Sequence, residues 1–152
     1  MANEKEKTAT CLELIRSNNI LVLSTLGGPE PHSSLMTYAS SEDGSEIYMV
    51  SRKNSKKWIN IERNPSVSLL IDDRDVKLEK RSGEIKALTI SGEHIPVTSH
   101  RERADIIKLI SDKNPHIAPL FSGPECEIIR IKTNYFQLLD GPEKFFSTER
   151  LA

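Results

Sequence analysis

Four basic residues gather where a predicted strand gives way to a predicted helix. Residues 51–57 read Ser-Arg-Lys-Asn-Ser-Lys-Lys, which places Arg52 and Lys53 close to Lys56 and Lys57. The first turn of a helix has unpaired backbone N–H groups and partial positive charge, which attract anions. Lysine ammonium groups neutralise a phosphate and serine hydroxyls add hydrogen bonds to it. The segment therefore predicts a phosphate site, although solvated lysines on a helix face would give the same composition.

The sequence offers few other chemical motifs. It contains no G-x-G-x-x-G, G-x-S-x-G or H-E-x-x-H segment, so dinucleotide-binding, serine-hydrolase and zinc-protease chemistry are not indicated. The histidines lack paired metal-ligand spacing, and we expect no metal site; they occupy positions 32, 94, 100 and 116. Cys11 and Cys126 stand far apart in the sequence, which predicts two reduced thiols, with Cys11 packed inside. Acidic pairs such as Asp72-Asp73 are expected to be solvated surface rather than a general acid–base site.

Short apolar segments separated by turn residues indicate a mainly β protein. The first three predicted strands should form an antiparallel meander, because Gly27-Gly28-Pro29 and the later turn-rich residues 40–45 both favour chain reversal. Gly92 lies inside a later predicted strand and indicates a β-bulge at which that strand bends. The full set of predicted strands covers residues 20–25, 32–39, 46–51, 66–71, 85–97, 126–132 and 135–139.

Three helices are expected beside these strands. The first covers residues 8–18, and the second covers residues 55–64, where Asn64-Pro65 should end it. Trp58 and Ile61 should pack the second helix onto the sheet. The third follows the segment Ser99-His-Arg-Glu102, which is a capping-box pattern.

The remaining segments are read as connections. Residues 72–84 are dominated by charge and should form a solvated link between strands. Residues 112–123 contain several turn residues and are expected to be mostly loop around one short helical turn at 117–121. The residues after Asp140-Gly141-Pro142 are read as a polar tail.

Size and charge narrow the class of protein further. The 152 residues fit one domain, residues 1–152, and the elements predict an α+β antiparallel barrel with peripheral helices rather than a parallel sheet. The net charge of −1 provides no general attraction to nucleic acid or to an anionic membrane. The N-terminal residues lack the organisation of a secretory signal, and no apolar run approaches the ~20 residues of a spanning helix. A cytoplasmic location is expected.

The run from Gly27 to Pro65 resembles the FMN-binding half of the pyridoxamine-phosphate-oxidase-like family. In both, three strands with a Gly/Pro turn and a hairpin precede a Ser-basic-Lys helix start that closes on Asn-Pro. The resemblance implies a split β-barrel of six to seven strands and a homodimer with flavin at the subunit interface. It also implies FMN contacts from His32, Ser33, Ser34, Leu35, Met36 and Thr37 to the ring and ribityl chain, and from Val50, Ser51, Lys56 and Lys57 to the phosphate.

Two departures bear on the activity that this resemblance implies. Pyridoxamine-phosphate oxidases have basic residues at both ends of the second-strand motif, where this sequence has His32 and Thr37. Their C-terminal tryptophan and arginine set is also missing from residues 143–152. Vitamin B6 oxidation is therefore not expected, and with fewer charges at the phosphate, loose FMN binding or a different flavin-like ligand stays open.

Two functions are compatible with the sequence. The first is an FMN-dependent oxidoreductase with a small-molecule electron donor or acceptor, in which the flavin performs the redox step. The second is a non-catalytic module that holds a flavin, a deazaflavin coenzyme or haem, and the fold alone does not separate the two. A nucleic-acid-binding barrel is not favoured, because near-neutral charge and 5% aromatic residues provide little basic groove or stacking surface.

Overall fold

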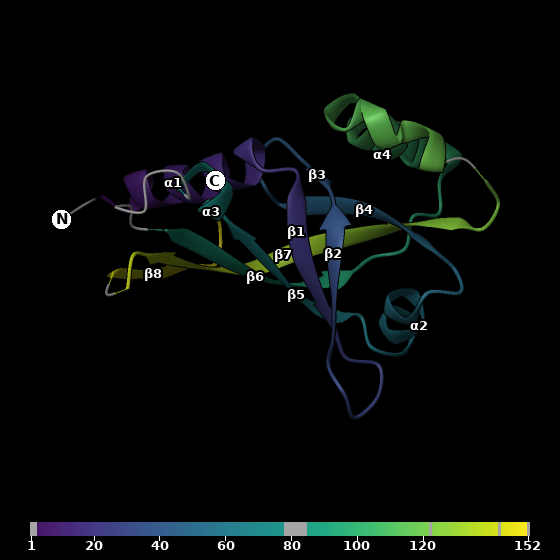
Figure 1. The fold of residues 1–152 in the computed structure, drawn as a ribbon, viewed down its shortest axis with the longest axis horizontal. Helices are drawn as coiled ribbons and strands as arrows, with labels where there is room; N and C mark the ends of the chain where they lie inside the picture. The colour runs from purple at the N-terminus through teal and green to yellow at the C-terminus, as the bar shows by residue number, and fades with distance from the viewer. Residues whose placement is uncertain (1–2, 78–84, 122, 143, 152) are drawn as a thin grey trace.

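One antiparallel sheet organises the computed structural model, which describes residues 3–77, 85–121, 123–142 and 144–151 (Figure 1). Its strands follow the order β2-β1-β5-β6-β7-β4-β3, with β8 also paired to β7. They are β1 (Ile20–Thr25), β2 (His32–Thr37), β3 (Ala39–Ser40), β4 (Glu46–Arg52), β5 (Ser66–Asp72), β6 (Lys86–His94), β7 (Cys126–Asp140) and β8 (Lys144–Thr148). The predicted α+β class and antiparallel split barrel are confirmed.

The two ends of this sheet meet through a single residue. β2 ends at Thr37 on one edge and β3 starts at Ala39 on the other, so Tyr38 carries the chain across. Its side chain is buried, and its hydroxyl donates to the carbonyl oxygen of Ile15 at 2.5 Å. Within the described residues no ladder joins β2 to β4, which leaves the barrel split there. The predicted meander is confirmed for β1 with β2. The predicted strand 32–39 breaks at Tyr38, however, so that only its last residue, Ala39, pairs with β4, whose main partner is β7.

β7 is the longest strand and holds the barrel together. It was expected as two strands, 126–132 and 135–139, but it runs unbroken and pairs along one edge first with β4 and then with β8. β6 lies along its other edge, and that register passes from Ser91↔Tyr135 to Gly92↔Thr133. The predicted bulge at Gly92 is thus confirmed. A Cβ at Gly92 would lie 2.6 Å from the carbonyl oxygen of Lys132, so only glycine fits.

In the described part of the chain, four helices and a 3-10 segment surround the sheet, with α1 and α4 above the strands and α2 below them in Figure 1. The first is longer than predicted, because Asn3 caps it through a bond from the backbone N–H of Lys5. The capping prediction at Ser99 is confirmed, since its hydroxyl accepts from the N–H of Glu102 at 3.3 Å. The helices are α1 (Glu4–Ser17), α2 (Lys56–Arg63), α3 (Arg74–Lys77) and α4 (His100–Lys113), and η1 (Pro115–Phe121) is the 3-10 segment.

Three connections differ from their predictions. The link predicted over 72–84 contains α3, and its residues 78–84 lie outside the described part of the chain. The loop predicted over 112–123 begins inside α4 and then forms η1. The polar tail contains β8, whose Phe146 packs on the core. None of the described helices is both long and apolar enough to cross a membrane.

The main core lies between the inner face of the sheet and α1. Cys11, Leu14 and Ile15 follow the i, i+3, i+4 spacing of one helix face, and all three are buried against the sheet. Cys11 is packed as predicted. Trp58 and Ile61 bring α2 onto the same core, also as predicted. A second apolar cluster, which contains Tyr48, Ile106 and Ile128, lies beneath α4. The two clusters fix α2 and α4 relative to the sheet.

Candidate functional site

A cavity of about 400 Å³ opens where the barrel is split, between β2, β4, the start of α2 and η1. This volume falls within the range of about 300–1,000 Å³ that small-molecule sites occupy. No backbone ladder closes the gap between β2 and β4 in the described residues, so side chains form the walls. The split itself therefore creates the space, and we call it the split cavity.

One side of the split cavity is apolar. The apolar lining residues come from β2, β4 and η1, although η1 follows β4 by about seventy residues in the sequence. Leu35 and Leu120 are 72% and 71% exposed, which is unusual for leucine and marks the rim of the opening. The apolar lining consists of Leu35, Met36, Val50, Ile117, Leu120 and Phe121. A flat, uncharged ring system would be accommodated on this side.

The other side of the split cavity is polar and lies at the beginning of α2. The hydroxyl oxygens of Ser51 and Ser55 are 2.7 Å apart, and the Ser55 hydroxyl also accepts from the backbone N–H of Trp58 at 3.3 Å. Ser55 is thus the N-cap of α2. Asn54 and Lys57 complete this side with Arg52. Cationic groups beside a helix N-terminus form an environment suited to an anion.

Close packing behind the split cavity sets the position of α2. The side-chain amide of Asn60 is buried and donates to the hydroxyl of Thr25 in β1 at 3.1 Å. A Cβ on Gly27 would collide with the backbone of Asn60, so glycine allows the β1–β2 turn to approach the helix. On the opposite side, the thiol of Cys126 donates to the carbonyl oxygen of Leu120 at 3.7 Å and links β7 to η1. These contacts hold the two walls.

Six of the ten predicted cofactor contacts line the split cavity: Leu35, Met36, Thr37, Val50, Ser51 and Lys57. The other four, His32, Ser33, Ser34 and Lys56, do not line it. The first three belong to the half of β2 that pairs with residues 23–25, away from the crossing at Tyr38. Lys56 is the exposed first residue of α2. All ten FMN contacts stay predictions.

Several lining residues were missed by the sequence prediction. Arg52 and Asn54 lie in the basic segment, and the two-residue alternation of β4 places Arg52 on the same side as Val50. This alternation was a usable signal. No sequence signal identifies Cys126 or the residues of η1 as lining residues, because only the tertiary fold brings them to β4.

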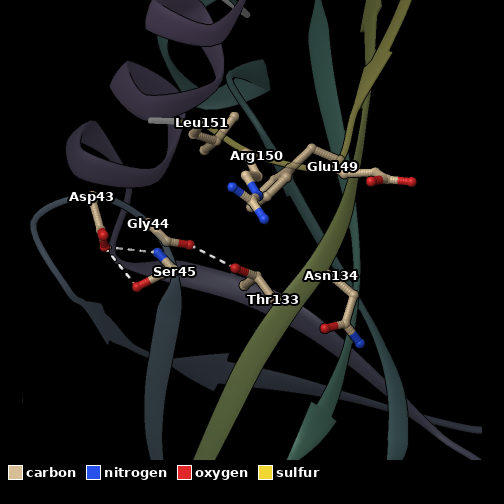
Figure 2. Close-up of a pocket in the computed structure, with 9 residues that line it drawn as sticks. Asp43, Gly44, Ser45, Thr133, Asn134, Glu149, Arg150 and Leu151 are labelled. Atoms are coloured by element: carbon tan, nitrogen blue, oxygen red, sulfur yellow. Dashed lines mark hydrogen bonds between the residues drawn. The ribbon is translucent and has the colours of Figure 1, made fainter.

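A second cavity, of about 380 Å³, lies between the β3–β4 turn, the bulge of β7 and residues 149–151 (Figure 2). Its hydrogen bonds are internal: the hydroxyl of Thr133 donates to the carbonyl oxygen of Gly44, and Asp43 accepts from the N–H and hydroxyl of Ser45. These bonds hold the pKa of Asp43 below its usual value. Its wall carries the carboxylates of Asp43 and Glu149 beside the guanidinium of Arg150, so its formal charge is not cationic as it is on the polar side of the split cavity. None of the ten predicted cofactor contacts lines this second cavity.

Comparison with protein families gives a match over residues 8–132 to the model of the family described as pyridoxamine 5'-phosphate oxidase. The chain belongs to the pyridoxamine 5'-phosphate oxidase family. The resemblance inferred from residues 27–65 is therefore confirmed, and it extends well beyond them. The match includes both sides of the split cavity.

One relative from the pyridoxamine 5'-phosphate oxidase family matches less than half of this chain. A pyridoxamine 5'-phosphate oxidase homolog from Schizosaccharomyces pombe is 39% identical over 67 residues, which are 39% of this chain and 35% of that protein. The chain thus spans only about a third of that relative.

Several solved structures share the fold of this chain. The haem-binding protein of Mycobacterium smegmatis has a TM-score of 0.80 at 17% identity, over 93% of this chain and 57% of that one. The haem storage protein HutZ of Vibrio cholerae has a TM-score of 0.69 at 16% identity, over 91% and 92% of the two chains. At these identities the likeness concerns the fold.

Proposed function

We propose that this protein binds FMN in the split cavity and acts as a flavin-dependent oxidoreductase on a small-molecule electron donor or acceptor. The observation that supports this most directly is the division of the cavity into an apolar side and a cationic side at a helix start. FMN has the same division, with a flat ring system at one end and a phosphate at the other. Membership of the pyridoxamine 5'-phosphate oxidase family agrees with this choice.

The residues of the split cavity have distinct tasks in this proposal. Lys57 and the first backbone N–H groups of α2 neutralise the phosphate. Ser51 and Ser55, joined by their 2.7 Å contact, fix the backbone that presents those groups. Met36, Val50 and Phe121 contact the ring and exclude water from it. The bound flavin supplies the hydride chemistry, while the protein orients it and controls access.

A homodimer is part of the same proposal. Across β2, β1 and β5, the register aligns Leu35, Val22 and Leu70 in one apolar row on the outer face of the sheet. A row of serines, Ser33, Ser24 and Ser68, runs beside it, and such small side chains allow close approach of another surface. Because this row ends at the rim of the split cavity, a second copy seated on it would cover the ring.

A non-catalytic ligand-binding module is the alternative, with a flavin, a deazaflavin coenzyme or haem as its ligand. It is favoured by the names of the two structural neighbours, which refer to haem binding and haem storage. The lining of the split cavity includes Met36 and Cys126, residue types that ligate haem iron. Its cationic side at α2, in contrast, suits a phosphate.

Ligand titration of the purified protein separates these functions. We expect FMN to bind and Lys57→Ala to weaken its binding by tenfold or more, since a charge-assisted hydrogen bond to phosphate is lost. Lys86→Ala, which changes a lysine outside the cavity, is the matched control and should bind FMN normally.

Turnover then decides between an enzyme and a module. The FMN-loaded protein should transfer electrons catalytically from a reduced nicotinamide to an artificial acceptor. Tight FMN binding without any turnover would support the non-catalytic module, and preference for haem over FMN would contradict the proposed cofactor.

A further inference from the structure

A further cavity, of about 550 Å³, lies against a different face of α2 from the one that borders the split cavity. Trp58, Ile61 and Glu62 line it at the i, i+3, i+4 spacing of one helix face. Its volume lies within the range of small-molecule sites, and it shares no lining residue with the split cavity. We call it the Trp58 cavity. Its other lining residues are Pro65, His94, Pro96, Val97, Glu127 and Ile128.

Backbone hydrogen bonds fix the walls of the Trp58 cavity. The N–H of His94 donates to the carbonyl oxygen of Pro65 at 2.8 Å, which joins the end of β6 to the residue before β5. The N–H of Ile95 donates to the carbonyl oxygen of Arg130 at 2.8 Å. The guanidinium group of Arg130 then donates to the carbonyl oxygen of Pro96 at 2.8 Å. A ligand would therefore find the cavity already formed, which lowers the entropic cost of binding.

Most of the lining of the Trp58 cavity is apolar or aromatic. Trp58 is half-buried and packs against the main core, together with the buried Ile61. The ring of His94 meets the indole edge-on, with 5.4 Å between the centroids. Burial lowers the pKa of His94 below 6.5, so its ring is uncharged at neutral pH. The body of a ligand that fits here should be apolar.

The charged side chains of the lining are both acidic. Glu127 is held by Lys53 at 3.2 Å and by Arg103 at 3.6 Å, neither of which lines the cavity. Glu62 forms no ion pair with any residue that the structure describes. The described lining contains no lysine or arginine. Its charge is thus the reverse of the charge on the polar side of the split cavity.

We infer that the Trp58 cavity is a second ligand site, and that its ligand is a small organic cation, namely a protonated amine on an aromatic or branched apolar body. The carboxylate of Glu62 compensates the ammonium group, while Trp58 and Ile61 contact the apolar body. Indole is the side chain that interacts best with a cation through its ring. A carboxylate of the same shape would be repelled by Glu62. This site does not depend on the proposed binding of FMN.

Fluorescence titration of the full-length protein tests the inference directly, because Trp58 is the only tryptophan in the sequence. Three probes of similar shape differ in charge: phenethylammonium, 2-phenylethanol and 3-phenylpropionate. The amine should bind about tenfold more tightly than the alcohol, through a cation–π contact and an exposed ion pair together. The carboxylate should bind more weakly than the alcohol.

Glu62→Gln separates the charge from the shape of the cavity. The preference for the amine over the alcohol should fall to about threefold or less, since only the ring contact and the paired Glu127 remain, while the affinity for the alcohol should not change. Glu13→Gln removes an exposed carboxylate of α1 and should keep the full preference. Glu62 is itself exposed, so we expect its variant to fold.

Three results would overturn the inference: equal affinity for the amine and the alcohol, an unchanged preference in Glu62→Gln, or no binding of any probe. Calorimetry with the same probes covers the case in which a ligand binds without altering the fluorescence, and an absence of heat there counts as no binding. A protein that binds the amine but takes up no FMN would overturn the proposed function and leave this site in place.

Discussion

The hydroxyl oxygens of Ser51 and Ser55 lie 2.7 Å apart, and this contact joins the end of β4 to the start of α2. Ser55 shares the same oxygen with the backbone N–H of Trp58 as the N-cap of the helix. The two serines therefore connect strand, helix and the polar side of the split cavity. A change in either serine should affect stability and ligand binding together.

Ser55→Ala should destabilise the protein by about 1 kcal/mol, because the first turn of α2 loses its cap. FMN affinity should fall as well, since the N–H groups at the helix start are less well fixed. Urea unfolding and FMN titration measure the two effects. Ser147→Ala, at an exposed position of β8 outside the cavity, is the control and should be close to wild type in both. Loss of stability without any loss of FMN affinity would contradict the proposed position of the phosphate.

Gly27→Ala should destabilise the protein by about 2 kcal/mol, the range found when a packed site is overfilled. The added Cβ would meet the backbone and side chain of Asn60, whose bond to Thr25 positions α2. Gly28→Ala is a close control, because a Cβ there meets nothing within 4 Å. Thermal unfolding should show a clear drop for the first variant only. Equal stability of the two variants would show that this contact does not set the position of α2.

Much of this local arrangement could be predicted from the sequence. The cap at Ser99, the end of α2 before Pro65 and the bulge at Gly92 each depend on local geometry that a few neighbouring residues determine. Six of the predicted cofactor contacts line the split cavity, because they lie beside the start of α2 or on β2.

The pairing of strands that are distant in the sequence could not be predicted in the same way. The chain crosses at Tyr38 from β2 at one edge of the sheet to β3 at the other edge, and no local signal distinguishes that crossing from one continuous strand. The residues of η1 reach the cavity only because α4 packs on the second apolar cluster. The predicted cofactor contacts omitted Arg52, because the sequence does not distinguish the four basic residues from one another. The structure distinguishes them, since Lys53 pairs with Glu127.

Leu70→Glu should weaken the proposed homodimer, because it places a charge in the apolar row that Leu70 forms with Val22 and Leu35. Light scattering after gel filtration should show a dimer for the wild type and a smaller mass for the variant. Leu70 does not line the split cavity, so a parallel fall in FMN affinity would show that a second copy completes the site. Leu109→Glu, on the exposed side of α4, should remain dimeric. A wild-type monomer that binds FMN fully would contradict the dimer.

His94 should make the protein less stable in mild acid. Its burial, followed by the nearby charge of Arg130, lowers the pKa of the imidazole below the ordinary value of 6.5. The unfolded chain then binds the proton more readily, so stability is fully present above pH 6.5 and declines as the pH falls toward the folded-state pKa. Its ring meets Trp58 edge-on, with 5.4 Å between the centroids.

His94→Phe retains an aromatic ring against Trp58 and removes the titrating group. The loss of unfolding free energy between about pH 7.5 and about pH 5.5, one pH unit to either side of the ordinary histidine pKa, should be smaller in this variant than in the wild type. His100→Ala removes an exposed histidine and should keep the wild-type dependence. An identical acid sensitivity in His94→Phe would show that other groups cause it.

The visible absorption spectrum of the freshly purified protein, with mass identification of any ligand released on denaturation, tests the central claim most directly. The proposed function predicts a flavin spectrum, or its appearance after FMN is added, and release of FMN itself. A colourless protein that takes up no added FMN would contradict the claim. A haem spectrum in its place would support the alternative ligand-binding module.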